Sequence, residues 1–175
     1  LRLLGDMVED GLVPAASTAI MRYGKLVKLA AFGRRGPGSK GPPVETDTIF
    51  LIASLTKPVV CAGAMLLVQD GKFCLEQPVA SLVPEFGVRG KEQVLVKHLF
   101  THTSGLPDQL PENIELRTRH APLAHFIDLV CKRELLFSPG TQVSYQSMGI
   151  LMLGEIVERI TGQRLRDFLH ERLFV

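Results

Sequence analysis

The sequence predicts an α+β fold, with a small antiparallel sheet in its first part and helices in most of the rest. Two short runs that favour strands flank Tyr23-Gly24, a pattern typical of a hairpin. From Val94 onward, apolar residues recur mostly at helical spacing. The 175 residues are enough for a domain with a sizeable core. We therefore expect one unit, in which residues 1–75 form a sheet-associated part with one long helix and residues 76–175 a mainly helical part.

Composition and charge argue against several classes of protein. Hydrophobic residues make up 46% and charged residues 22%, which is typical of globular proteins. The net charge is only +2, and no basic stripe follows the chain, so we expect no nucleic-acid partner. The longest apolar run, Val59–Val68, is shorter than the roughly 18 to 20 residues that a membrane-spanning helix needs. We therefore expect no membrane span, and we make no prediction of the oligomeric state.

The ends of the chain and its cysteines give two further expectations. The start lacks Met and has no signal-peptide-like apolar region, and the end stops on apolar residues, so we expect a natural protein that extends beyond both ends. The three cysteines, Cys61, Cys74 and Cys131, are odd in number and have no CxxC spacing. This argues against a disulfide framework and a zinc knuckle. We expect buried free thiols, which fit a reducing compartment.

The first elements that we expect are a short helix and the hairpin. Apolar residues near the start recur at helical spacing: Leu3, Leu4, Met7, Val8 and Leu12. Pro14 is expected to end this helix. The strands of the hairpin are predicted over Ala15–Arg22 and Lys25–Phe32.

Residues 33–43 are so rich in Gly and Pro that we expect a surface loop. The loop nearly matches a phosphate-binding loop. It differs because Ser39 precedes Lys40, where that motif needs Lys first, and because Pro42-Pro43 prevents an immediate helix. We therefore favour the plain surface loop.

A buried, strand-like run over Ile49–Ala53 is expected to lead into a long apolar helix that ends at Asp70-Gly71. Proline is tolerated only in the first turn of a helix, so Pro58 predicts a start near Ala53 or Ser54. Later helices are expected around residues 96–100, 123–130 and 148–160, with turns at residues 102–107 and 138–141.

Ser54 and Lys57 form an S-x-x-K motif at the predicted start of this helix. Three residues are close to one helical turn, so both side chains should emerge on the same face. A serine hydroxyl is a weak nucleophile that needs a base within hydrogen-bond reach, and the amides at the helix start can stabilise an oxyanion. The alternative is an ordinary helix cap at Ser54 with a solvated Lys57.

Tyr145 is the second candidate, placed after Pro139-Gly140-Thr141 and just before an apolar helix. Near a lysine ammonium its pKa would fall below the usual value of about 10, so it could shuttle a proton between nucleophile and leaving group. The alternative is a core or hinge tyrosine.

Together these residues resemble the class C β-lactamases and their relatives among esterases, D-amino-acid peptidases and penicillin-binding proteins. The resemblance covers nearly the whole chain and rests on an ordered set of motifs. They are Thr48-Ile49-Phe50, Ser54-Leu55-Thr56-Lys57, Gly71-Lys72, the run over residues 99–107, and Pro139-Gly140-Thr141 before Tyr145. The fold implied is β-lactamase/transpeptidase-like, with the active site between the sheet and the helical region. The family's third motif would lie beyond Val175.

The resemblance implies that Ser54 is acylated, that Lys57 assists proton transfer, and that Tyr145 is the general base or its partner. Ser147 stands where many β-lactamase relatives have Asn, and its hydroxyl would contact substrate; esterases are thus the better comparison. His102 would have a supporting role.

The expected function is that of a serine hydrolase acting on small ester, amide or peptide substrates through an acyl-enzyme, and the alternative is a non-catalytic relative that serves as a binding or self-assembling scaffold. His98 and His102 are four residues apart, as metal ligands can be, but Leu99 stands where a zinc protease would have Glu. We predict no metal and no cofactor.

Overall fold

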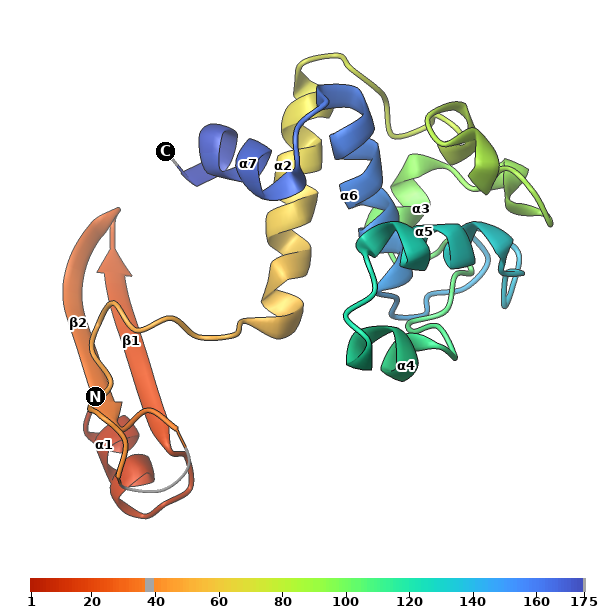
Figure 1. The fold of residues 1–175 in the computed structure, drawn as a ribbon. Helices are drawn as coiled ribbons and strands as arrows, with labels where there is room; N and C mark the ends of the chain where they lie inside the picture. The colour runs from red at the N-terminus through yellow and green to blue at the C-terminus, as the bar shows by residue number, and fades with distance from the viewer. Residues whose placement is uncertain (37–39, 175) are drawn as a thin grey trace. The chain divides into compact units, whose positions relative to one another are not determined.

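The computed structural model describes residues 1–36 and 40–174, which divide into two compact units, Leu1–Ile52 and Ala53–Val175. Figure 1 shows the course of the chain through both units. The division differs from the one expected near residue 75. The reason is that the long helix α2 (Thr56–Gln69) packs against α6 (Met148–Thr161), so it belongs with the helical part and not with the hairpin.

The first unit consists of helix α1 (Arg2–Glu9) and the antiparallel hairpin of β1 (Ala15–Arg22) and β2 (Lys25–Gly33). The predicted hairpin is confirmed, and its second strand is one residue longer than expected. Its two-residue turn has φ of 50° at Tyr23 and 73° at Gly24. Positive φ at both positions is the type I′ geometry, whose twist matches that of the strands it joins.

The predicted first helix is confirmed, but its end was placed too late. It stops at Glu9, five residues before Pro14. Gly11 has φ of 70°, and the Leu12 amide donates to the Met7 carbonyl, which closes the end of the helix. A left-handed glycine therefore ends this helix before proline is reached.

Apolar side chains in the first unit are largely exposed. Val44 is the one fully buried hydrophobic residue among those described in this unit. Ile49 and Leu51 are 96% and 97% exposed, and no strand forms there, so the expected buried strand before Ser54 is wrong. An apolar run becomes a buried strand only where another element covers it. The loop over residues 33–43 closes with a bridge between Arg34 and Pro43, while residues 37–39 of the predicted loop lie outside the described residues.

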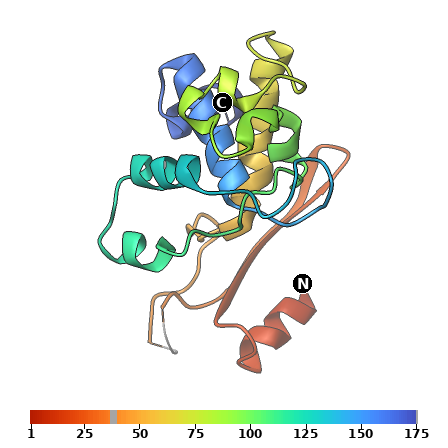
Figure 2. The ribbon, with the colours of Figure 1, turned by 90° about the vertical axis from the view of Figure 1, so that its right-hand side faces the viewer.

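The second unit is built on α2 and α6, which lie side by side in Figures 1 and 2. The buried residues of α2 follow one helical stripe: Val60, Gly63, Ala64 and Leu67. Helix α6 is buried along most of its length and forms the centre of the core. In the described part of the chain, no helix combines the length and the apolar character needed to cross a bilayer.

Four shorter helices complete the second unit. They are α3 (Val96–Phe100), α4 (Asn113–Thr118), α5 (Leu123–Lys132) and α7 (Leu165–Leu169). The expected helices correspond to α3, α5 and α6. The short helices α4 and α7 were not foreseen.

The predicted end of α2 at Asp70-Gly71 is confirmed. The Gly71 amide donates to the Val68 carbonyl at 3.0 Å, and the Lys72 amide donates to the Leu67 carbonyl at 2.9 Å. This paired closure is a Schellman motif, and it requires the left-handed φ of 67° that Gly71 adopts.

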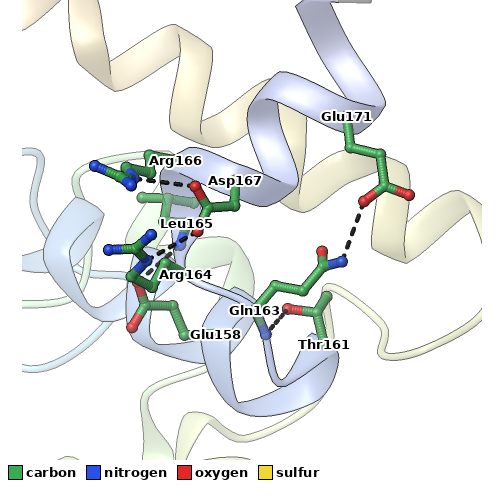
Figure 3. A network of polar contacts seen from close by, with 8 residues as sticks. All are labelled: Glu158, Thr161, Gln163, Arg164, Leu165, Arg166, Asp167 and Glu171. Atoms are coloured by element: carbon green, nitrogen blue, oxygen red, sulfur yellow. Dashed lines mark hydrogen bonds and ion pairs between the residues drawn. The ribbon is translucent and has the colours of Figure 1, made fainter.

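A polar corner joins α6 to α7 (Figure 3). Glu158 accepts the Leu165 amide at 2.8 Å, and Asp167 accepts from Arg164 at 2.8 Å. The bond to Glu158 satisfies one amide at the start of α7, and the pair between Arg164 and Asp167 links side chains of the same turn. Helix α7 is too short to be stable by itself. The corner thereby returns α7 to the side of α2, where Phe168 and Leu169 are buried.

The cysteines differ in environment. Cys131 is buried, and burial raises its pKa to about 11, so it is an inert core thiol. Cys61 is half-buried, and burial raises its pKa too. Cys74 is exposed, so the expectation of buried thiols is wrong for this residue.

Two glycines with left-handed φ allow a matched test of the packing. A Cβ at Gly105 (φ 82°) would lie 2.3 Å from the Phe137 carbonyl oxygen, whereas a Cβ at Gly71 meets open space. We expect Gly71→Ala to lower the free energy of unfolding by about 1 kcal/mol and Gly105→Ala by roughly 3 kcal/mol or more. Denaturant unfolding of both variants measures the difference. Equal losses would contradict the close approach of the two backbone segments.

Candidate active site

Ser54 lies in a 3-10 turn, η1 (Ala53–Leu55), directly before α2. The helical segment begins at Ala53 as expected, but the regular α-helix begins only at Thr56. Ala53 has φ of 45°, a conformation that costs a residue with a side chain about 1 kcal/mol or more. This turn leaves the Ser54 side chain exposed ahead of the helix.

Lys57 lies in the first turn of α2, next to Pro58. Its Nζ donates to Ser54 Oγ at 3.1 Å. The prediction that the two side chains share one face is therefore confirmed. Proline fits at this position because the amides of the first turn have no intrahelical acceptor.

Tyr145 reaches the same point from the segment before α6. Its hydroxyl donates to Ser54 Oγ at 2.8 Å, across 91 positions of sequence. Lys57 Nζ lies 4.6 Å from the centre of the Tyr145 ring. The structure thus brings together Ser54, Lys57 and Tyr145, all within the second unit.

The segment that carries Tyr145 is held by the turn that follows α3. The Ser144 amide donates to the His102 carbonyl at 2.9 Å, and the Gln146 amide donates to His102 Nδ1 at 3.3 Å. The His102 ring lies against the Tyr145 ring, with centroids 4.9 Å apart and planes inclined by 40°. His102 adopts φ of 60°, so this turn holds a strained residue in place beside the tyrosine.

Gln146 is fully buried behind Tyr145, and its amide is satisfied at both ends. Oε1 accepts from Ser104 Oγ at 2.5 Å, and Nε2 donates to the His98 carbonyl at 3.1 Å. A buried amide with both ends bonded fixes the backbone around it, because breaking either bond leaves a polar group unsatisfied. Sequence reasoning gave no role to Gln146 or Ser104, although Gln146 adjoins Tyr145 and Ser104 lies within the run over residues 99–107.

Ser147 is bonded to a residue that sequence reasoning missed, Asp108. The Ser147 amide and hydroxyl both donate to Asp108 Oδ1, at 2.9 Å and 2.7 Å. Ser147 is the N-cap of α6, and a carboxylate there is favoured by the helix dipole. Asp108 follows Leu106-Pro107 directly, so its place after the motif was the signal available. The proposed contact of Ser147 with substrate stays a prediction.

The charges around Tyr145 act in opposite directions. The neighbouring Lys57 ammonium, followed by the hydrogen bond to Ser54, lowers the pKa of Tyr145 below its ordinary value. The Asp108 carboxylate raises the same pKa and offsets part of that effect. A tyrosine in this setting loses its proton more readily than one in water, which suits a group that takes the proton of Ser54.

The two histidines considered as metal ligands are engaged in the fold. His98 Nδ1 accepts the Leu95 amide at 3.1 Å, and burial is the main cause that lowers the pKa of His98. His102 Nδ1 accepts the Gln146 amide. In the described ranges, 1–36 and 40–174, no group of three or more His, Cys, Asp or Glu residues is arranged to hold a metal ion.

The chain is similar to known proteins in sequence and in structure. The sequence model of a family described as "Beta-lactamase" matches residues 2–175. Esterase EstB of Burkholderia gladioli is 34% identical over 86% of this chain and 42% of its own length. Penicillin-binding protein 4 of Amycolatopsis lactamdurans is 34% identical over 93% of this chain and 42% of its own length. The chain therefore spans less than half the length of these relatives.

A solved structure shows the same fold. The D-amino acid amidase from Ochrobactrum anthropi SV3, complexed with L-phenylalanine, superposes with a TM-score of 0.84 at 28% identity. The match covers 99% of this chain and 47% of the amidase. The expected β-lactamase/transpeptidase-like fold is thus confirmed.

The charge balance at Tyr145 gives a direct test. Lys57→Met removes the positive charge and keeps much of the side chain's bulk, so the pKa of Tyr145 should rise toward its ordinary value. Tyrosinate absorbance is titrated in each protein and in its Tyr145→Phe form, and the difference reports Tyr145. Lys72→Met, beyond the other end of α2, is the control. If the titration midpoint of Tyr145 is unchanged in Lys57→Met, Lys57 is not the group that lowers the pKa of Tyr145.

Proposed function

The chain belongs to the beta-lactamase family, and on that premise we propose that Ser54 is the nucleophile of a serine hydrolase that forms an acyl-enzyme. The observation that carries the proposal is the convergence of two groups on one hydroxyl. Lys57 Nζ and the Tyr145 hydroxyl lie 3.1 Å and 2.8 Å from Ser54 Oγ. A proton can be transferred between two heavy atoms at such distances.

The reaction would proceed in two steps. Ser54 Oγ bonds to the substrate carbonyl carbon while its proton passes to the Tyr145 oxygen, and the bond to the leaving group then breaks as the leaving group takes that proton. Water next attacks the ester carbonyl on Ser54 and gives one proton to the Tyr145 oxygen, which passes it to Ser54 Oγ as the bond to the acyl group breaks and the acid is released. In the hydrogen bond between Tyr145 and Ser54 Oγ, the Tyr145 hydroxyl is the donor. Tyr145 must therefore lose its own proton before it can act as the base. The lowered pKa of Tyr145 favours that loss.

Stabilisation of the oxyanion is the other requirement. The Ser54 amide, at the start of the helical segment, would supply one donor, and the positive end of α2 would help. The resemblance puts a second donor on a strand beyond Val175. Loss of one such donor costs on the order of 100-fold in rate, so we propose that a longer chain is needed for full turnover.

The proposed substrates are small esters or amides, including β-lactams and D-amino-acid peptides. Two relatives bear the names of an esterase and a D-amino acid amidase, which supports hydrolysis of an acyl bond. Ser147 offers no amide to a substrate side chain, and its hydroxyl is bonded to Asp108. This favours an esterase-like preference over lactam recognition.

The deciding experiment is intact-mass labelling with an activated ester and with a penicillin. It is done on the 175-residue chain and on a chain that continues past Val175, with Ser54→Ala as control. We expect an adduct on the longer chain that is lost in the Ser54→Ala form, and faster labelling by the ester. If the longer chain forms no adduct with either reagent, the proposal fails and the non-catalytic scaffold takes its place.

The roles of Lys57 and Ser147 can be separated by rate. Lys57→Ala should slow acylation by at least about 100-fold, because the nucleophile loses an activating partner. Ser147→Ala should cost about tenfold or less, since the Ser147 amide still donates to Asp108. Stopped-flow acylation by the activated ester measures both. Equal, mild losses would show that the roles are wrongly assigned.

A further inference from the structure

We propose that Asp108 is a positioning residue for Tyr145, which it holds through Ser147, and that its negative charge acts on the same tyrosine. The inference rests on the proposed function for its effect on catalysis, but its structural part does not. The sequence analysis assigned no role to Asp108.

The geometry is that of a two-point attachment. One carboxylate oxygen of Asp108 accepts both the amide and the hydroxyl of Ser147. Hydrogen bonds to a charged acceptor are roughly twice as strong as neutral ones. Ser147 is two residues after Tyr145 and is the N-cap of α6. The attachment therefore fixes the backbone of Tyr145 relative to the start of α6.

Asp108 can act in this way because its own turn is anchored. Leu106, two residues earlier, is fully buried, and its amide donates to Ser104 Oγ at 3.1 Å. Ser104 Oγ in turn donates to the buried Gln146. The turn and the tyrosine segment are therefore joined at Gln146 and again at Ser147, and the second joint is the only one of the two that carries a charge.

Tyr145 lies directly before the two joints. Its ring is 51% exposed, and its hydroxyl reaches Ser54. The hydroxyl lies at the far end of the ring, so a small tilt of the Tyr145 backbone moves the hydroxyl by a larger distance. Release of Ser147 from Asp108 would thus lengthen the contact between Tyr145 and Ser54 and slow the transfer of the proton.

Three charged or titratable groups lie against Tyr145 or act on it through their charge, one from α2 and two from the turn after α3. Lys57 comes from α2, His102 from the turn after α3, and Asp108 from the end of that turn. Lys57 lowers the pKa of Tyr145 and Asp108 raises it. Removal of the Asp108 charge alone should therefore move the ionisation of Tyr145 to lower pH, a shift that a purely structural residue would not produce.

Two substitutions separate the charge from the attachment. Asp108→Asn keeps an oxygen that can accept both donors and removes the charge, while Asp108→Ala removes both. Asp128→Asn, the same chemical change at an exposed aspartate on α5, is the matched control. Circular dichroism of each variant checks that the fold is retained.

The first readout does not depend on catalysis. Tyrosinate absorbance is titrated for each form against the same form with Tyr145→Phe. We expect the Tyr145 midpoint to move to lower pH in Asp108→Asn and to stay in place in Asp128→Asn. A midpoint unchanged in Asp108→Asn overturns the role of the charge, whether or not the protein is an enzyme.

The second readout is the rate at which the activated ester acylates Ser54 in the longer chain. Asp108→Ala should slow acylation about tenfold or more, and Asp108→Asn should keep the rate within about threefold, with a pH profile moved to lower pH. An Asp108→Ala rate equal to that of the unchanged protein overturns the positioning role. Absence of labelling in the unchanged protein would instead refute the proposed function and leave the titration result standing.

Discussion

The packing of α2 against α6 is the contact on which the candidate site depends. Ser54 lies just before α2, and Tyr145 lies just before α6. Because the two helices pack side by side, their first turns meet, and the Tyr145 hydroxyl comes to 2.8 Å from Ser54 Oγ. The buried stripe of α2 and the buried residues of α6 make this pairing the centre of the core, so the site is built on a closely packed part of the second unit.

The turn after α3 supplies the finer placement. Helix packing sets distances between backbones, but a proton transfer depends on fractions of an ångström. The bonds from residues 102–108 to Ser144, Gln146 and Ser147 supply that precision, because they hold the chain on both sides of Tyr145. Strained φ values at His102 and Ala53 flank the site, which is where a fold tolerates such cost when function requires it.

The pKa of Tyr145 is the result of opposing effects, of which the contact with Lys57 is the largest. Lys57 promotes the ionisation of Tyr145, and Asp108 opposes it. A tyrosine that ionised too readily would be a weak base, and one that ionised too little would stay protonated near neutral pH. The relatives named as esterase and amidase share the family and the fold with this chain, so the balance at Tyr145 offers one way in which related sites can differ in leaving group.

The sequence by itself determined the features that depend on local backbone geometry. The S-x-x-K spacing puts Ser54 and Lys57 on one face, Gly71 ends α2, and Tyr23-Gly24 closes the hairpin, because each follows from the period of a helix or the φ that a turn requires. Only the tertiary structure decided the rest. The exposure of Ile49–Ile52, the boundary before Ala53 and the bond from Ser147 to Asp108 depend on residues far apart in the chain. Tyr145 stands between these cases, since motif order suggested its role but only the packing of α6 on α2 brings it to Ser54.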